Sequence, residues 1–126
     1  MKPVVYDAGV LSAGDRDERT TWADHRVRLE DGVVPVVPSV IVAQVSRSPK
    51  QVQLRRFLRG CDVAVLDEDG AHDAGLLLGR TRTQDICDAI VVALAAKLGA
   101  EVITGDRKDL RRLVTASGKR IRLHDV

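Results

Sequence analysis

Two kinds of hydrophobic pattern alternate along the chain. Short runs rich in β-branched residues occur at 4–6, 33–37, 63–66, 101–104 and 121–123, and each run predicts a short strand. We expect the first and fourth of these strands to be buried on both faces of a sheet.

Between these runs, apolar residues recur at helical spacing. The predicted helices cover residues 17–29, 39–46, 49–58, 68–78, 85–98 and 106–116. The helix over 85–98 has the clearest pattern and stops before Gly99. Its apolar stripe contains Ile86, Ala89, Ile90, Ala93, Leu94 and Leu98. Alternating strands and helices predict one α/β domain over residues 1–126, with a mainly parallel, twisted sheet of about five strands and helices on both faces.

Composition narrows the possible functions. The chain has 126 residues, a length that fits one domain. Its only aromatic residues, Tyr6, Trp22 and Phe57, are scattered along the sequence. Proteins that read single-stranded nucleic acids by base stacking need several aromatic side chains on one surface, so we expect no stacking platform of that kind.

The compartment is expected to be the cytoplasm. Cys61 and Cys87 are too few for a disulfide framework and are interpreted as buried small apolar residues under reducing conditions. No apolar run is long enough to span a membrane, and the first residues lack the apolar core of a signal peptide.

Charge is segregated along the chain although the net charge is only +2. Residues 47–59 hold five basic and no acidic side chains, 60–79 hold five acidic and no basic ones, and 107–122 hold seven basic and one acidic. Basic stretches of this kind either form a phosphate-binding surface or are simply solvated helix faces, and the sequence leaves both open.

Aspartates follow the two strands that are expected to be buried on both faces. Asp7 comes directly after residues 4–6, and Asp106 comes after 101–104. Ligands of open α/β sheets bind beyond the carboxyl ends of the strands, at the point where the strand order reverses. If these two strands are neighbours, about 4.8 Å apart, Asp7 and Asp106 lie close together.

A second acidic pair stands at the start of the helix over 85–98. Asp85 and Asp88 are three residues apart, so they share one helix face at the same end of the sheet. Four converging carboxylates repel one another unless a cation neutralises them. Mg²⁺ or Mn²⁺ suits such oxygen ligands, and carboxylate-bound ions activate water for attack on phosphodiesters.

Each of these aspartates also has a structural interpretation. Asp7 can cap a helix starting at Ala8, and Asp85 and Asp106 can cap the helices that follow them. Asp88 is explained least well in this way, because a capped helix does not need a second carboxylate.

The ordered set of motifs resembles the PIN-domain family, and within it the VapC-type toxins of bacterial toxin–antitoxin pairs. The resemblance covers nearly the whole chain. It depends on Val4-Val5-Tyr6-Asp7, on residues 38–45 (PSVIVAQV), on residues 85–95 (DICDAIVVALA) and on residues 102–110 (VITGDRKDL).

The resemblance implies a metal-dependent ribonuclease. The family's acidic cluster matches Asp7, Asp88 and Asp106 as metal ligands, Asp85 as an additional acid, and Thr104 as the hydroxyl beside the last aspartate. It further implies a homodimer that a cognate antitoxin inhibits by covering the site.

Two positions depart from the family pattern. Gln44 stands where the family usually has a glutamate, and Gly9 stands where a hydroxyl is common. The first departure predicts weaker Mg²⁺ binding than in a protein with the glutamate, so Gln44→Glu should bind the ion more tightly in a calorimetric titration. It also leaves open an alternative, a catalytically weak or inactive PIN-like module that binds RNA or a partner protein.

Gly9 also argues against phosphotransferases with an aspartyl nucleophile, which need a second aspartate at that position.

Basic residues complete the expected site. We expect arginines around the acidic pocket to contact RNA phosphates, which positions a substrate without reading its sequence. The candidates are Arg47, Arg55, Arg56, Arg107 and Arg111.

Overall fold

The computed structural model describes residues 2–126 and contains one five-stranded sheet. The strands are β1 (Val4–Tyr6), β2 (Val36–Pro38), β3 (Asp62–Ala64), β4 (Glu101–Thr104) and β5 (Leu123–Asp125). Every neighbouring pair is parallel, and the order across the sheet is β3-β2-β1-β4-β5. The predicted α/β class and parallel five-stranded sheet are confirmed.

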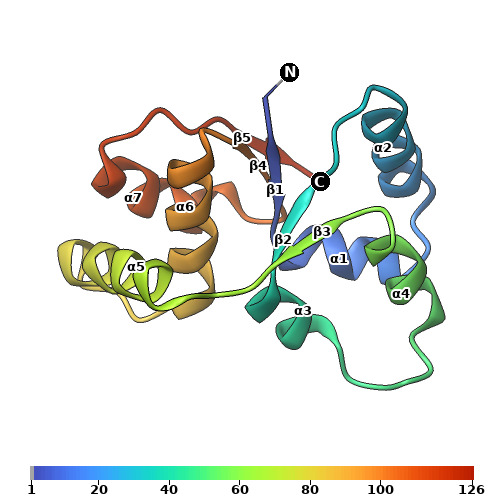
Figure 1. Ribbon diagram of the computed structural model, residues 1–126, viewed down its shortest axis with the longest axis horizontal. Helices are drawn as coiled ribbons and strands as arrows, with labels where there is room; N and C mark the ends of the chain where they lie inside the picture. Colours follow the sequence, from blue (N-terminus) through green and yellow to red (C-terminus); the bar gives the residue numbers. More distant parts are fainter. Residues whose placement is uncertain (1) are drawn as a thin grey trace.

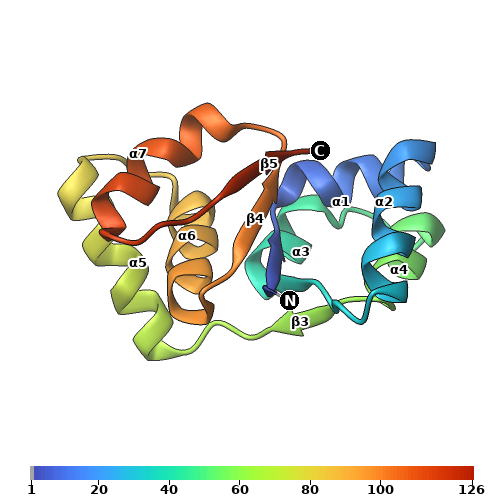
Figure 2. The ribbon, with the colours of Figure 1, turned by 90° about the horizontal axis from the view of Figure 1, so that it is seen from above.

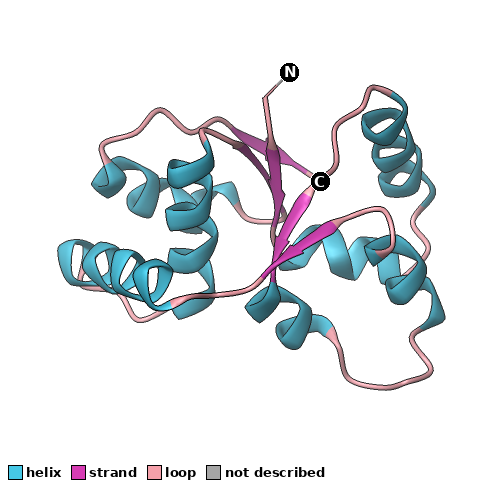
Figure 3. Cartoon of the chain, viewed as in Figure 1, coloured by secondary structure: helices cyan, strands magenta, loops and turns pink. Residues whose placement is uncertain are grey.

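Helices cover both faces of this sheet. They are α1 (Ala8–Asp15), α2 (Arg19–Glu30), α3 (Ser39–Val45), α4 (Val52–Leu58), α5 (Glu68–Thr81), α6 (Ile86–Leu98) and α7 (Arg107–Ser117). The first four helices lie on one side of the strands and α5 to α7 on the other (Figures 1 and 2). Figure 3 shows the strands as a narrow central layer between the two helical layers.

The central strands form the core, as their apolar sequences predict. Val5 and Tyr6 in β1 and Val102 in β4 are fully buried. Removal of apolar surface from water on both faces stabilises these strands, at roughly 25 cal/mol per Å². The sheet edges are more exposed, since Val63 in β3 is 41% accessible.

The structure corrects several predicted details. β2, β3 and β5 are shifted by one to three residues from the predicted runs, and α4 begins at Val52 rather than at Pro49. The predicted apolar stripe of α6 is wrong at its ends, where Ile86 is 61% and Leu98 39% exposed. The middle of α6 contacts the sheet as well as α5 and α7, so Val91 and Val92 are buried outside the predicted stripe. Cys61 and Cys87 are free and only partly buried.

The three aromatic residues, scattered in sequence, are gathered in space. Phe57 in α4 lies 5.8 Å from Tyr6 and 5.0 Å from Trp22, between ring centroids. His25 in α2 stacks on Phe57 at 4.1 Å and hydrogen bonds to the Tyr6 hydroxyl at 2.9 Å. This aromatic cluster joins β1, α2 and α4 into one unit.

No helix within the described part of the chain is both long and apolar enough to span a bilayer.

Candidate functional site

Asp7 and Asp106 are joined through Thr104, at the carboxyl ends of β1 and β4. These strands are neighbours, and the strand order reverses between them. Thr104 is fully buried; its hydroxyl donates a hydrogen bond to Asp7 Oδ2 and accepts one from the Asp106 amide at 2.9 Å. The switch point of the sheet therefore carries an ordered polar cluster where a ligand is expected.

Two glycines let these segments approach each other. A Cβ atom on Gly9 would lie 2.8 Å from both Cα and N of Gly105, a distance that real Cβ atoms do not adopt. The backbone of α1 thus contacts the loop after β4 directly. This contact explains why the position two residues after Asp7 holds glycine rather than a hydroxyl residue.

Asp7 is a buried carboxyl group with several polar partners. Its side chain caps α1 by accepting a hydrogen bond from the Gly9 amide at 3.0 Å. Burial raises its pKa above the ordinary value, while the Thr104 hydroxyl and the nearby amides of Gly9, Gly105 and Val10 oppose that rise.

Asp85 and Asp88 open α6 on the other side of the sheet. Asp85 accepts a hydrogen bond from the Asp88 amide at 3.0 Å and so caps the helix. Burial, followed by repulsion from Asp85 and from Asp7 and Asp109, raises the pKa of Asp88 to about 7. The negative charges of three separate segments therefore act on one half-buried carboxyl group.

Asp106 caps the last helix in the same manner. It accepts a hydrogen bond from the Asp109 amide at 3.2 Å. A hydrogen bond with the Asp106 side chain, together with its charge, raises the pKa of Asp109. The capping interpretation is thus confirmed for Asp7, Asp85 and Asp106, and Asp88 is the aspartate that capping leaves unexplained.

A polar hollow of about 340 Å³ lies between the start of α6 and α7. Asp85 and Asp88 line one side of it, and Lys108 and Arg112 line another. The two basic residues were not among the predicted contacts. Their four-residue spacing on one face of α7, beside Asp109, is the signal that could have identified them.

The predicted arginines are distributed over several elements. Arg47 Nη1 donates to the backbone oxygen of Ala43 at 2.8 Å, and Arg55 Nη1 donates to that of Ser48 at 3.0 Å. Arg107 forms an ion pair with Asp125 at 3.0 Å. Arg56 on α4 and Arg111 on α7 are exposed.

Gln44 lies on α3 and is exposed. Over residues 2–126, its side chain forms no hydrogen bond with any of the four aspartates.

The donor set suits a hard divalent cation. Within residues 2–126, no three His, Cys, Asp or Glu side chains are arranged to ligate a single ion directly. The available donors are carboxylate oxygens whose mutual repulsion a cation would relieve, and Mg²⁺ or Mn²⁺ commonly binds through one or two carboxylates and retained waters. The carboxylate oxygens of Asp7, Asp85, Asp88 and Asp106 are therefore of the ligand type that such an ion takes, and retained waters would complete its coordination.

Comparisons with known proteins agree with this fold. The family model described as "PIN domain" matches residues 4–115. Among characterised protein sequences, no match was found.

Solved structures share the fold at low sequence identity. VapBC2 from Rickettsia felis bound to a DNA fragment from its promoter matches with a TM-score of 0.74 at 15% identity, covering 98% of each chain. A toxin–antitoxin complex from Klebsiella pneumoniae matches with a TM-score of 0.66 at 19% identity, over 84% of this chain and 88% of that chain. FitAcB from Neisseria gonorrhoeae matches with 0.62 at 14% identity, over 96% of each.

A parallel sheet with acidic groups at its switch point defines an α/β domain of the kind that binds ligands beyond its strand ends. More specifically, this chain belongs to the PIN-domain family. PIN domains are generally nucleases, and these nucleases generally use divalent metal ions.

Proposed function

We propose that this protein is a VapC-type toxin, a ribonuclease that hydrolyses RNA phosphodiester bonds with Mg²⁺ or Mn²⁺. The observation that supports this most is the pair of acidic groups joined by Thr104 at the switch point, with Asp88 within electrostatic reach from α6. The similarity to solved toxin–antitoxin complexes supports the biological role.

In this proposal, Asp7, Asp85, Asp88 and Asp106 would hold the metal, in part through waters bound to it. A bound ion would supply positive charge that activates water and stabilises charge developing on the phosphate. Thr104 fixes the orientation of the buried Asp7 carboxylate and ties it to the loop of Asp106. A fixed orientation favours catalysis because a group that is already in place costs no reorganisation energy during the reaction.

Basic residues beside the carboxylates bind the substrate. Lys108 and Arg112 line the same hollow as Asp85 and Asp88, so they are placed to bind oxygens of an RNA phosphate. Arginine forms paired hydrogen bonds with phosphate, whereas lysine acts as a point charge. The predicted contacts Arg107 and Arg111 lie on the same helix, with Arg107 in an ion pair with Asp125.

We propose two partners besides RNA and a cytoplasmic location. One partner is a cognate antitoxin that covers the acidic site, and the other is a second copy of the chain in a homodimer. The neighbours from Rickettsia felis and Klebsiella pneumoniae support the first partner. The family resemblance supports the second.

A cleavage assay tests the proposed activity. Structured and unstructured RNAs are incubated with the purified protein in Mn²⁺, in Mg²⁺ or in EDTA. We expect cleavage with metal and none in EDTA, and we expect a loss of at least 100-fold in Asp7→Asn and in Asp88→Asn, an order-of-magnitude value for essential electrostatic groups. Asp31→Asn is the matched control, because Asp31 is an exposed residue at the end of α2, before β2 and away from the strand ends that carry the site.

The alternative function is RNA or protein binding without catalysis. It follows from Gln44, which adds no negative charge to the site and is exposed on α3. RNA binding that persists in EDTA, with no cleavage under any metal condition, would support this alternative. Activity gained in Gln44→Glu would then show that the missing carboxylate is the cause.

A further inference from the structure

A second polar hollow lies away from the acidic site, between α2 and α4. Its volume is about 470 Å³. Arg19 and Arg26 from α2 and Arg56 from α4 contribute three positive charges to its lining, and Asp17 contributes one negative charge. Trp22 also borders it.

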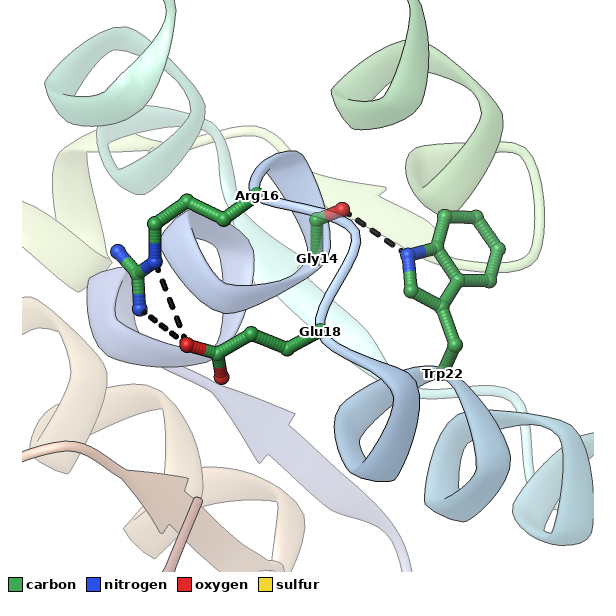
Figure 4. Close-up of polar contacts among 4 residues, drawn as sticks. All are labelled: Gly14, Arg16, Glu18 and Trp22. Carbon is green, nitrogen blue, oxygen red and sulfur yellow. Dashed lines mark hydrogen bonds and ion pairs between the residues drawn. The ribbon is translucent and has the colours of Figure 1, made fainter.

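The three arginines of this basic hollow have no partners of their own. Arg16, by contrast, pairs with Glu18 at 3.0 Å (Figure 4). Within residues 2–126, the guanidinium groups of Arg19, Arg26 and Arg56 form no ion pair and no hydrogen bond. Three unpaired guanidinium groups around one hollow create a local field that attracts an anion.

Trp22 gives the basic hollow a fixed aromatic wall. Its indole N–H donates to the backbone oxygen of Gly14 at 3.0 Å, as Figure 4 shows. The ring also packs edge-to-face against Phe57 at 5.0 Å. These two contacts set the orientation of the indole, and its remaining exposed part lines the hollow.

Helix α1 connects the basic hollow with the acidic site. It begins after Asp7 and ends at Asp15, just before Asp17. Eight helical residues span about 12 Å. An extended polynucleotide bound at the acidic site can therefore reach the hollow within a few nucleotides.

We propose that the basic hollow binds the phosphate backbone of the RNA substrate a few nucleotides from the bond that is cut, with one base against Trp22. This inference rests on the proposed ribonuclease function and assigns a second contact for the same substrate. Arginine suits phosphate because its planar group forms paired hydrogen bonds, and an indole stacks on any base.

An acidic protein segment is the competing occupant. A helical segment needs a row of apolar contacts to anchor it in a groove. The lining here offers Trp22 and Ala23 as its apolar side chains, and the other residues are charged or polar. The chemistry of this surface therefore favours a polynucleotide over a protein helix.

The experiment uses Trp22 as an internal probe, because it is the only tryptophan in the chain. An unstructured oligoribonucleotide is titrated into the protein in EDTA, where cleavage cannot occur, and binding is followed in parallel by the anisotropy of labelled RNA. We expect saturable quenching of Trp22 emission with the same midpoint as the anisotropy change. A Trp22 signal that stays constant while the anisotropy saturates would contradict the proposal, as would the absence of RNA binding.

A charge-removal variant tests the arginines. In the triple variant Arg19→Gln, Arg26→Gln, Arg56→Gln, we expect at least tenfold weaker RNA binding. On single strands each phosphate contact contributes about 0.7 to the slope of log K against log salt. The loss of three contacts should therefore make that slope smaller by about 2. The control triple variant, Arg59→Gln, Arg120→Gln, Arg122→Gln, removes the same charge from exposed positions outside the hollow and should keep the wild-type slope. Equal slopes in both triple variants would overturn the proposal.

Two further results separate this inference from the proposed function. Quenching by RNA in a protein that never cleaves RNA supports the hollow and contradicts the ribonuclease. RNA cleavage without quenching of Trp22 supports the ribonuclease and contradicts RNA binding at the hollow. A polyglutamate peptide that quenches Trp22 as strongly as RNA would assign the hollow to an acidic protein segment instead.

Discussion

At the scale of single residues, capping a helix and forming a site are compatible roles for the same aspartate. Asp7, Asp85 and Asp106 each accept one backbone amide at the start of a helix. A carboxylate offers about four lone-pair sites, so one or two hydrogen bonds leave room for an ion or its water. The helix N-terminus also stabilises the negative charge that a metal site needs. Asp88 differs because its own carboxyl group caps no helix. Burial and the neighbouring negative charges destabilise its ionised form.

Thr104 is the residue on which the geometry of the site depends most. In Thr104→Val the side chain keeps its shape but loses the hydroxyl that binds Asp7 and the Asp106 amide. Because the buried Asp7 carboxyl group then loses one of its partners, we expect the free energy of unfolding to fall by about 1–3 kcal/mol, measured by urea denaturation.

A matched change on the surface serves as the control for this variant. Thr115 on α7 is exposed, and its hydroxyl bonds only to the Arg111 backbone oxygen at 3.1 Å. Thr115→Val should change stability by less than about 0.5 kcal/mol. If Thr104→Val is as mild as Thr115→Val, the hydroxyl link does not hold the site together.

At the scale of elements, the close approach of α1 to the loop after β4 brings the acidic groups together. Gly9 and Gly105 are the contact points, and a side chain on Gly9 would collide with backbone atoms that cannot move aside independently. The distance between Asp7 and Thr104 therefore depends on the absence of a Cβ atom at one position of α1.

Gly9→Ala tests this element-level contact. Alanine favours a helix by up to about 1 kcal/mol over glycine, but the forced separation of α1 from β4 costs more. We expect a net loss of about 1–3 kcal/mol of stability by chemical denaturation, together with reduced RNA cleavage.

Gly75→Ala is the matched control within another helix. A Cβ atom on Gly75 in α5 meets nothing within 4 Å, so the same substitution should stabilise the protein by about 0.5–1 kcal/mol. Stabilisation by both substitutions would mean that the Gly9 contact does not constrain the site.

At the scale of the whole molecule, β1 occupies the centre of the sheet and anchors the α1–α4 layer through the aromatic cluster. Tyr6 hydrogen bonds to His25, and Arg28 donates to the same hydroxyl at 3.0 Å. Burial, and then the positive charge of Arg28, lowers the pKa of His25 below 6.5, while the Phe57 backbone opposes this shift. The folded protein therefore resists protonation of His25.

This burial predicts a pH dependence of global stability. Above pH 6.5 His25 is neutral in both states, so its contribution to stability is fully present. As the pH falls below 6.5, the unfolded chain binds a proton that the folded chain does not, so stability decreases. Thermal melts from pH 7.5 to 5 should show a smaller decrease in His25→Gln than in the wild type. His72→Gln changes an exposed histidine on α5 and should keep the wild-type dependence. An identical pH dependence in all three proteins would contradict the prediction.

The sequence by itself determined the class of fold and the kinds of chemistry available. Hydrophobic periodicity identifies strands and helices because each element must bury one side, and β1 and β4 are buried as predicted. The positions of Asp7 and Asp106 after those strands were likewise readable, since parallel strands end at one edge. Helix boundaries were less exact where no local stop signal stands: α4 begins at Val52 rather than at Pro49, whereas α6 ends at Leu98, before Gly99, as predicted.

Only the tertiary structure decided which residues meet. The aromatic cluster joins residues from three elements, and Lys108 and Arg112 face Asp85 and Asp88 because α6 packs on α7. The close contact at Gly9 and the unpaired arginines of the basic hollow are likewise invisible in the sequence. Such contacts depend on the order of strands and the packing of helices, which local sequence patterns do not encode.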